Sequence, residues 1–201
     1  MTEKPILFSG EMVLAILRNT KSQTRRVIKC DGLDCEGPCG NTVTGDARFA
    51  GRDQAGNSVL LKCPHGETGG KLWVGETWQE DPVGEFGICY AATGHSDKCK
   101  IHSHLWRPSI FMPRRASRLT LEIVSVRAER LHDITEEDAK AEGAPEPTGK
   151  LGCYPAPWAT CTPGPLSFRE TFRTLWDNIN AKRGFGWELN PWVWRIEFKR
   201  I

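Results

Sequence analysis

The sequence lacks two features that would place the protein in a membrane or outside the cell. No stretch of the chain approaches the roughly 20 apolar residues of a membrane-spanning helix. The first five residues are polar and include an acid, unlike a secretory signal peptide. We therefore expect a cytoplasmic protein with no membrane partner.

A large excess of charge of either sign is also missing. Lys and Arg number 27 and Asp and Glu number 25, so the formal net charge is only +2. This balance gives no sign of bulk, sequence-independent binding to nucleic acid. The basic residues are nevertheless unevenly spread, with five in residues 18–29, four in residues 107–118, and no acid in either segment. These segments either form one anion-attracting face or remain separate solvated surfaces.

Internal repeats are absent, and the periodic segments are short. Apolar residues at helical spacing predict helices over 11–18, 135–143 and 166–179, whereas alternating or continuous apolar runs predict strands over 5–8, 24–28, 71–78, 117–131 and 191–198. Residues 30–70 and 81–107 look like irregular, Cys-rich insertions, and residues 143–166 form a Pro- and Gly-rich loop. We predict one α+β domain over residues 1–201, built on a small mixed or antiparallel β-barrel with two or three flanking helices.

The eight cysteines are many for a cytoplasmic chain of 201 residues. In a reducing compartment a disulfide framework is not expected, which leaves metal binding or free thiols. In the first insertion Cys30, Cys35, Cys39 and Cys63 are candidate ligands of a structural zinc ion, with free thiols as the alternative.

Longer motifs then indicate a family. The pattern Asn19-x-Lys21-x-x-Thr24-x-Arg26 resembles the ASCH signature Gly-x-Lys-x-x-Glu-x-Arg, and residues 108–123, 134–143 and 175–194 are similar to phage and prophage ASCH-like proteins. The resemblance covers most of the chain outside the two irregular stretches. It implies a PUA-like barrel that recognises RNA or modified nucleosides in a bacterial host cell.

Two departures from the signature matter. Asn19 replaces Gly, and both residues suit the end of a helix. Thr24 replaces Glu, as in the ASCH branch of small amidohydrolases that deacylate N4-acetylcytidine. Carried over by motif, the proposed catalytic set of that branch falls on Lys21, Thr24 and Glu142, and it requires no cofactor.

These residue types suit amide hydrolysis. Thr24 supplies a hydroxyl nucleophile, Lys21 a base if its pKa is lowered, and Glu142 a group that orients the lysine. Residues three apart in a strand point to opposite faces, so Lys21 and Thr24 meet only if Lys21 belongs to the turn before the strand.

The same reasoning gives candidate ligand-binding residues and leaves the function open between several classes. The candidates are Arg25, Arg26, Arg118 and Glu76, the last as a rival carboxylate for the same pocket. The leading hypothesis is recognition of RNA or a modified nucleoside, with or without hydrolysis of an N4-acylated cytidine. The alternatives are a non-catalytic nucleic-acid-binding module and a phage accessory protein that binds a host protein through its insertions.

Overall fold

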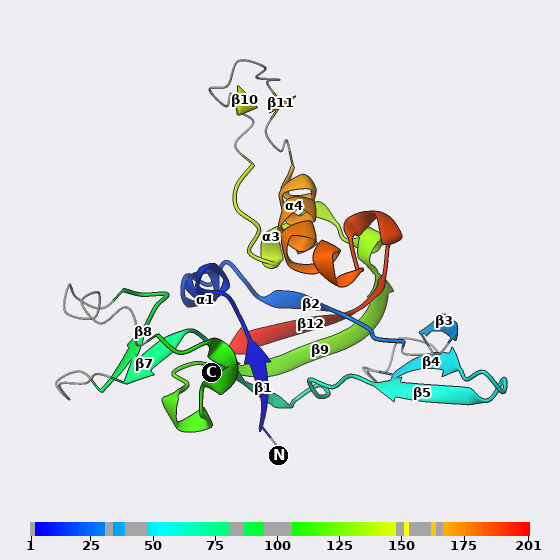
Figure 1. Ribbon diagram of the computed structural model, residues 1–201, viewed down its shortest axis with the longest axis horizontal. Helices are drawn as coiled ribbons and strands as arrows, with labels where there is room; N and C mark the ends of the chain where they lie inside the picture. The colour runs from blue at the N-terminus through cyan, green and yellow to red at the C-terminus, as the bar shows by residue number, and fades with distance from the viewer. Residues whose placement is uncertain are drawn as a thin grey trace.

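The fold is described from a computed structural model that covers residues 3–30, 34–38, 48–80, 87–94, 106–147, 151–152, 162–163 and 167–201. Within these residues the protein is an α+β structure with a mostly antiparallel main sheet and three α-helices (Figure 1). None of the described helices is long and apolar enough to cross a membrane.

The main sheet has five strands in the order β1-β6-β9-β12-β2. Their bounds are Glu3–Leu7 (β1), Lys71–Gly75 (β6), Thr120–Arg130 (β9), Trp192–Arg200 (β12) and Gln23–Val27 (β2). β1 runs parallel to β6, and the other neighbours pair antiparallel. Each strand predicted from the sequence overlaps one of these, so the strand periodicity is confirmed.

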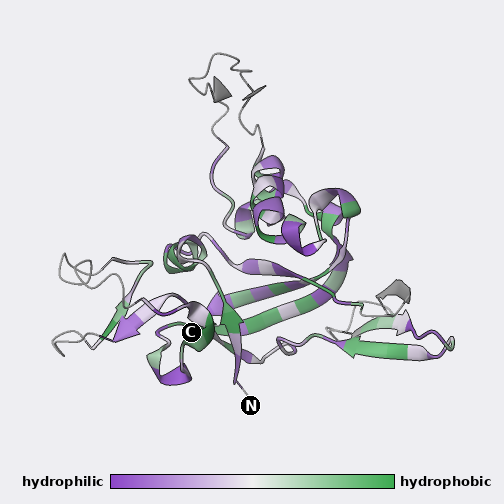
Figure 2. Cartoon of the chain, in the orientation of Figure 1, coloured by the Kyte–Doolittle hydropathy of each residue, from purple (hydrophilic) through white to green (hydrophobic). Residues whose placement is uncertain are grey.

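The two faces of the main sheet carry different chemistry. Side chains alternate along a strand, and Figure 2 shows hydrophobic and hydrophilic residues alternating along β9 and β12. On β2, Thr24 and Arg26 lie opposite Ile196 and Trp194 of β12, on the face that carries the larger apolar core. Arg25 lies opposite Arg195, on the other face.

The three predicted helices are present, and each begins at a hydroxyl cap. They are α1 (Gly10–Leu17), α3 (Glu136–Ala141) and α4 (Phe168–Asn180). Ser9, Thr135 and Ser167 each accept a hydrogen bond from a backbone N–H of the first turn, which satisfies a donor that the helix leaves unpaired. Helices α3 and α4 lie together on one side of β2 (Figure 1), where they enclose a second apolar core. Short 3-10 helices span Ser109–Phe111, Arg114–Ala116, Leu131–Asp133, Ala181–Arg183 and Trp187–Leu189.

The two stretches expected to be irregular contain ordered strands, so that expectation is wrong in part. The first holds a three-stranded antiparallel sheet of β3 (Asp34–Pro38), β4 (Arg48–Arg52) and β5 (Ser58–Lys62). Phe49 is fully buried against Trp192 and Trp194, at 5.2 and 6.3 Å between ring centroids, so this insertion shares the core of the main sheet.

The remaining strands are shorter. In the second stretch β8 (Ile88–Tyr90) pairs with β7 (Trp78–Glu80), and in the Pro- and Gly-rich loop β10 (Leu151–Gly152) pairs with β11 (Thr162–Pro163). The β3–β5 sheet and the β7–β8 hairpin extend from opposite ends of the main sheet (Figure 1).

A closed barrel is not seen in the described part of the chain. The edges of the main sheet are β1 and β2, and no backbone pairing joins them there. The edges do approach each other at one point, where the Arg26 guanidinium donates a 2.7 Å hydrogen bond to the carbonyl of Leu7 and lies 5.2 Å from the Phe8 ring. Closure into a barrel stays a prediction.

Candidate active site

Lys21 lies in a tight turn between α1 and β2. Asn19 adopts the left-handed conformation at φ 58°, as expected for a helix-ending Asn, and the backbone N–H groups of Thr20 and Lys21 both donate to the carbonyl of Ala15. Lys21 therefore precedes β2, and the alternation of side chains between the two faces of that strand does not apply to it. This is the condition under which Lys21 could lie near Thr24. A backbone bridge links Lys21 to Glu142 at the end of α3.

The Lys21 ammonium is buried against Glu142. Its Nζ donates to the Glu142 backbone carbonyl at 2.6 Å and to Glu142 Oε2 at 3.0 Å, and both side chains are at most 4% exposed. Burial lowers the pKa of Lys21 from its ordinary value, and the charge of Glu142 only partly offsets this effect. Two of the three catalytic residues inferred from the motif are thus in direct contact.

Arg25 contacts Glu142 from the other side. Its guanidinium contacts Glu142 Oε1 at 3.1 Å, Asp138 Oδ2 at 3.0 Å and Glu129 Oε1 at 2.6 Å. Asp138 also accepts from Arg195 at 2.7 Å. We call these residues together the buried charge cluster: Lys21, Arg25, Glu129, Asp138, Glu142 and Arg195.

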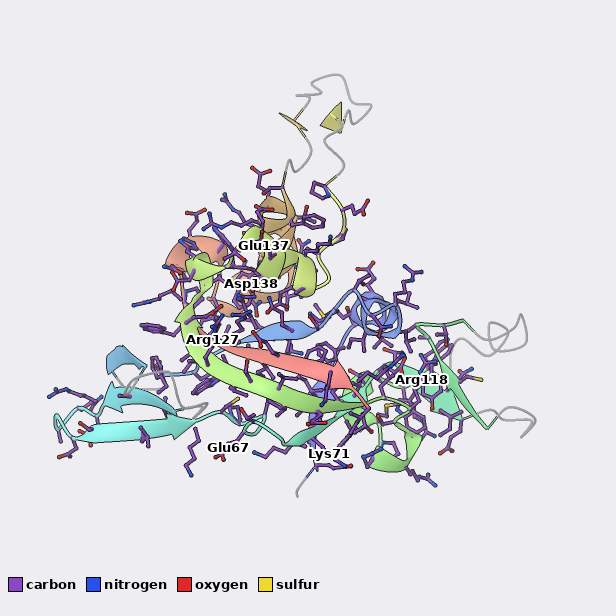
Figure 3. The ribbon with its side chains drawn as sticks, turned by 180° about the vertical axis from the view of Figure 1, so that it is seen from behind. Glu67, Lys71, Arg118, Arg127, Glu137 and Asp138 are labelled. Atoms are coloured by element: carbon purple, nitrogen blue, oxygen red, sulfur yellow. The ribbon has the colours of Figure 1, made fainter. Side chains whose placement is uncertain are left out.

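Several members of this cluster could not be identified from the motif. Asp138 lies on α3 (Figure 3), Glu129 and Arg195 on the two central strands, and Gln23 on β2 joins them by accepting from Arg195 at 2.9 Å. The one available signal was Arg195, a charged residue inside the strongly apolar run 192–198.

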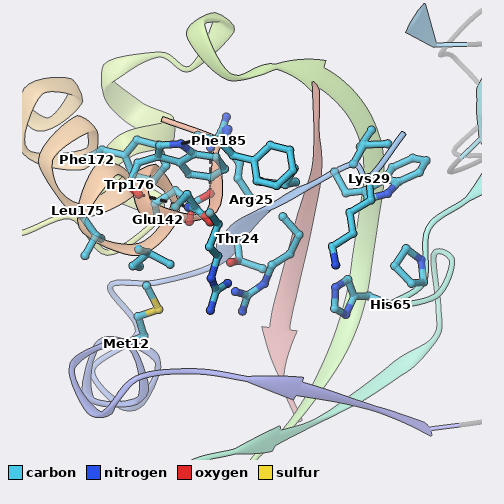
Figure 4. Close-up of a pocket in the computed structure, with 18 of the residues that line it drawn as sticks. Met12, Thr24, Arg25, Lys29, His65, Glu142, Phe172, Leu175, Trp176 and Phe185 are labelled. Carbon is cyan, nitrogen blue, oxygen red and sulfur yellow. Dashed lines mark hydrogen bonds and ion pairs between the residues drawn. The ribbon is translucent and has the colours of Figure 1, made fainter. Parts of the chain in front are cut away.

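Thr24 and Glu142 line a cavity of about 560 Å³ at the free edge of β2. Figure 4 shows Phe172, Leu175 and Trp176 of α4 on one side, Lys29 and His65 on the other, and Thr24 and Glu142 between them. We call Phe172, Leu175, Trp176 and Ile179 the apolar wall. Thr24 is 3% exposed, and its hydroxyl has no hydrogen-bond partner among the described residues.

Arg26 shares the strand face of Thr24 and lines the same cavity. Burial lowers the pKa of Arg26, Glu142 opposes this effect, and the nearby charge of Arg183 lowers it further. Burial, aided by Arg26 and Lys4, also lowers the pKa of His65 to about 4. His65 is therefore neutral at neutral pH.

Two predicted ligand-binding residues lie elsewhere. Arg118 forms a two-pronged ion pair with Glu76, at 2.8 and 2.9 Å, and stacks on the Tyr90 ring at 4.0 Å. Neither Glu76 nor Arg118 lines the cavity. The structure therefore places Thr24, Arg25, Arg26 and Glu142 in the lining of the cavity, holds Lys21 against Glu142 behind it, and separates Glu76 and Arg118 from them.

The zinc prediction stays a prediction. Cys39 and the side chain of Cys35 lie outside the described residues. Cys63 is a buried free thiol, but Cys30 is bonded in a disulfide, so in this structure it offers no thiolate to a zinc ion. No group of three or more His, Cys, Asp or Glu side chains suited to a metal is found within the described ranges.

Comparison with protein-family models, with curated protein sequences and with solved structures gives no match to this chain.

Proposed function

We propose that the cavity beside Thr24 is the active site of an amide hydrolase that acts on an N4-acylated cytidine or a similar acylated base. The observation that carries the proposal is the contact of Lys21 with Glu142, beside a cavity that Thr24 lines with an unpaired hydroxyl. The resemblance to the deacylating ASCH branch supplies the substrate class.

The hydrogen bonds of Lys21 support its role as the base. A neutral amine has two N–H groups and one lone pair, whereas an ammonium has three donors. Glu142 provides two acceptors, its carbonyl and Oε2, which matches the neutral form and leaves the lone pair for a third direction. Glu142 also contacts Arg25, which shares its charge with Glu129 and Asp138.

The reaction then follows from these groups. Lys21 takes the hydroxyl proton of Thr24 as Oγ1 attacks the amide carbon and forms a tetrahedral intermediate. The C–N bond breaks, the leaving nitrogen receives the proton from Lys21, and the acyl group remains on Thr24 as an ester. Water, deprotonated by Lys21, hydrolyses that ester and restores Thr24. The apolar wall shields the ester and accommodates the acyl group.

The test is cytidine release from N4-acetylcytidine by the full chain and its variants. Lys21→Met should lower kcat by about 10²- to 10⁴-fold, the usual contribution of a general base. Thr24→Val should abolish turnover, while Thr24→Ser, which keeps a hydroxyl, should retain part of it. The matched control is Ser22→Ala, which removes an exposed hydroxyl between the two residues. Activity that survives both Lys21→Met and Thr24→Val would refute the assignment.

An observation also favours a second candidate function, a binding module without turnover. Several basic side chains line the same cavity, as a site for a nucleic-acid backbone would require. This version predicts affinity for RNA that falls with salt and no cytidine release from the acylated nucleoside.

A further inference from the structure

Four basic side chains line the cavity and pair with no acid of the described residues. We call Arg26, Lys29, Lys62 and Arg183 together the basic wall. None of the four forms an ion pair with another described residue. Among the described residues that line the cavity Glu142 is the one acid, and its two oxygens already contact Lys21 and Arg25 of the buried charge cluster.

Arg26 is the innermost member of the basic wall. One of its terminal nitrogens donates to the carbonyl of Leu7, but its Nε is buried without any partner. A buried donor without an acceptor is costly, and the nearby charge of Arg183 adds repulsion. An anion in the cavity would remove both costs, because it would accept from Arg26 and screen the two guanidinium groups from each other.

The chemistry of this wall favours a phosphate. Arg guanidinium groups match the geometry of phosphate oxygens, and Lys29 and Lys62 add further exposed positive charge. The cavity, at about 560 Å³, has room for more than a nucleoside base, and its other side is lined by aromatic rings suited to contact with a base.

We infer that the basic wall binds a phosphate group of the ligand, so that the site takes an acylated nucleotide, free or within RNA, in preference to the neutral nucleoside. The acyl part of this inference rests on the proposed function. The phosphate part rests on the basic wall and is testable without turnover.

The experiment compares binding of cytidine 5′-monophosphate with binding of cytidine to the full chain by calorimetry. The nucleotide should bind about tenfold tighter or better, as expected for charge-assisted hydrogen bonds. The double variant Lys29→Gln/Arg183→Gln should lose most of this ratio, and since both side chains are exposed it should fold normally. The matched control Lys140→Gln/Lys182→Gln removes two exposed charges that do not line the cavity and should keep the ratio. Equal affinities in the wild type, or a ratio that the first double variant leaves unchanged, would overturn the inference.

Kinetics separate this inference from the proposed function and identify the source of the phosphate. Turnover of N4-acetylcytidine with no preference for its 5′-monophosphate would overturn the phosphate site alone. A nucleotide preference in binding without any turnover would overturn the hydrolase and leave the phosphate site supported. If kcat/KM is higher for a short RNA with one N4-acetylcytidine than for the mononucleotide, the phosphate that binds is that of RNA. If kcat/KM is higher for the mononucleotide, the phosphate is that of a free nucleotide.

Discussion

Replacing Glu142 by Gln should destabilise the protein strongly, because it removes a buried carboxylate that contacts two buried basic side chains. The Glu142 side chain is 4% exposed, and its two oxygens contact Lys21 at 3.0 Å and Arg25 at 3.1 Å. Removing one partner of a buried ion pair costs about 3–5 kcal/mol. Gln has the same shape and keeps one oxygen toward Lys21, so the expected loss is at the lower end, about 3 kcal/mol.

Urea unfolding measures this loss. With a slope of about 3 kcal/mol per M at the upper end of the usual range, the midpoint should fall by about 1 M. The control is Glu137→Gln on the exposed side of the same helix (Figure 3), which should stay within about 0.5 kcal/mol of the wild type. A Glu142→Gln variant that is as stable as this control would refute the reasoning that Lys21 and Arg25 depend on the carboxylate.

The same substitution makes a kinetic prediction with a defined sign. The charge of Glu142 raises the pKa of Lys21 against the effect of burial, so its removal should lower that pKa further. If Lys21 is the base, activity rises with pH as the lysine loses its proton, and in the Glu142→Gln variant this rise should move to lower pH. A rise that stays in place or moves to higher pH would exclude Lys21 as the titrating group.

Three further predictions concern neighbouring residues. The pKa of His65 is lowered to about 4, so as the pH falls the unfolded chain takes up a proton before the folded one. The free energy of unfolding should therefore fall by roughly 2–3 kcal/mol between pH 6.5 and pH 4. Urea unfolding of the His65→Gln variant should show a smaller fall. Lys21 binds its proton less tightly in the folded protein than in the unfolded chain. The free energy of unfolding of the wild type, compared with that of Lys21→Met in the same assay, should therefore increase as the pH rises toward 10.5. Gly143 has φ +78°, and an added Cβ would lie 3.1 Å from the Cβ atoms of Ala15 and Lys21. The substitution Gly143→Ala should therefore lower the free energy of unfolding by about 1–3 kcal/mol. The thermal midpoint should fall by several degrees.

The parts of the site that the sequence predicted are those set by local chemistry. An Asn at the end of an amphipathic helix indicated the turn that carries Lys21, and Thr135 indicated where α3 begins. The helix that Thr135 caps ends at Ala141, just before Gly143, so Glu142 is its C-cap residue. These signals lie within a few residues of one another, so no knowledge of strand pairing was needed to use them.

The partners of Arg25 could not be found in this way. Its contacts with Glu129, Asp138 and Glu142 join residues more than 100 positions apart, and they depend on the register that sets Arg25 opposite Arg195. The error in the first insertion has a different cause. There Asp53 forms a tight turn with Asn57 between β4 and β5, and a segment rich in Gly, Asp and Asn resembles a long loop until its strands are paired.

Stability alone does not account for the buried charge cluster. Apolar side chains of similar volume in place of a buried ion pair are often neutral or stabilising, by about 1–4 kcal/mol, because they avoid the cost of removing charges from water. The cluster nevertheless joins the turn before β2, the edge strand itself and the end of α3, and it does so where Thr24 meets a cavity. An apolar contact could hold these three segments together, but it would place no ionisable amine against Glu142. Proton transfer at this cavity, as proposed above, would give the charges at Lys21, Arg25 and Glu142 a role beyond the folding of the sheet edge.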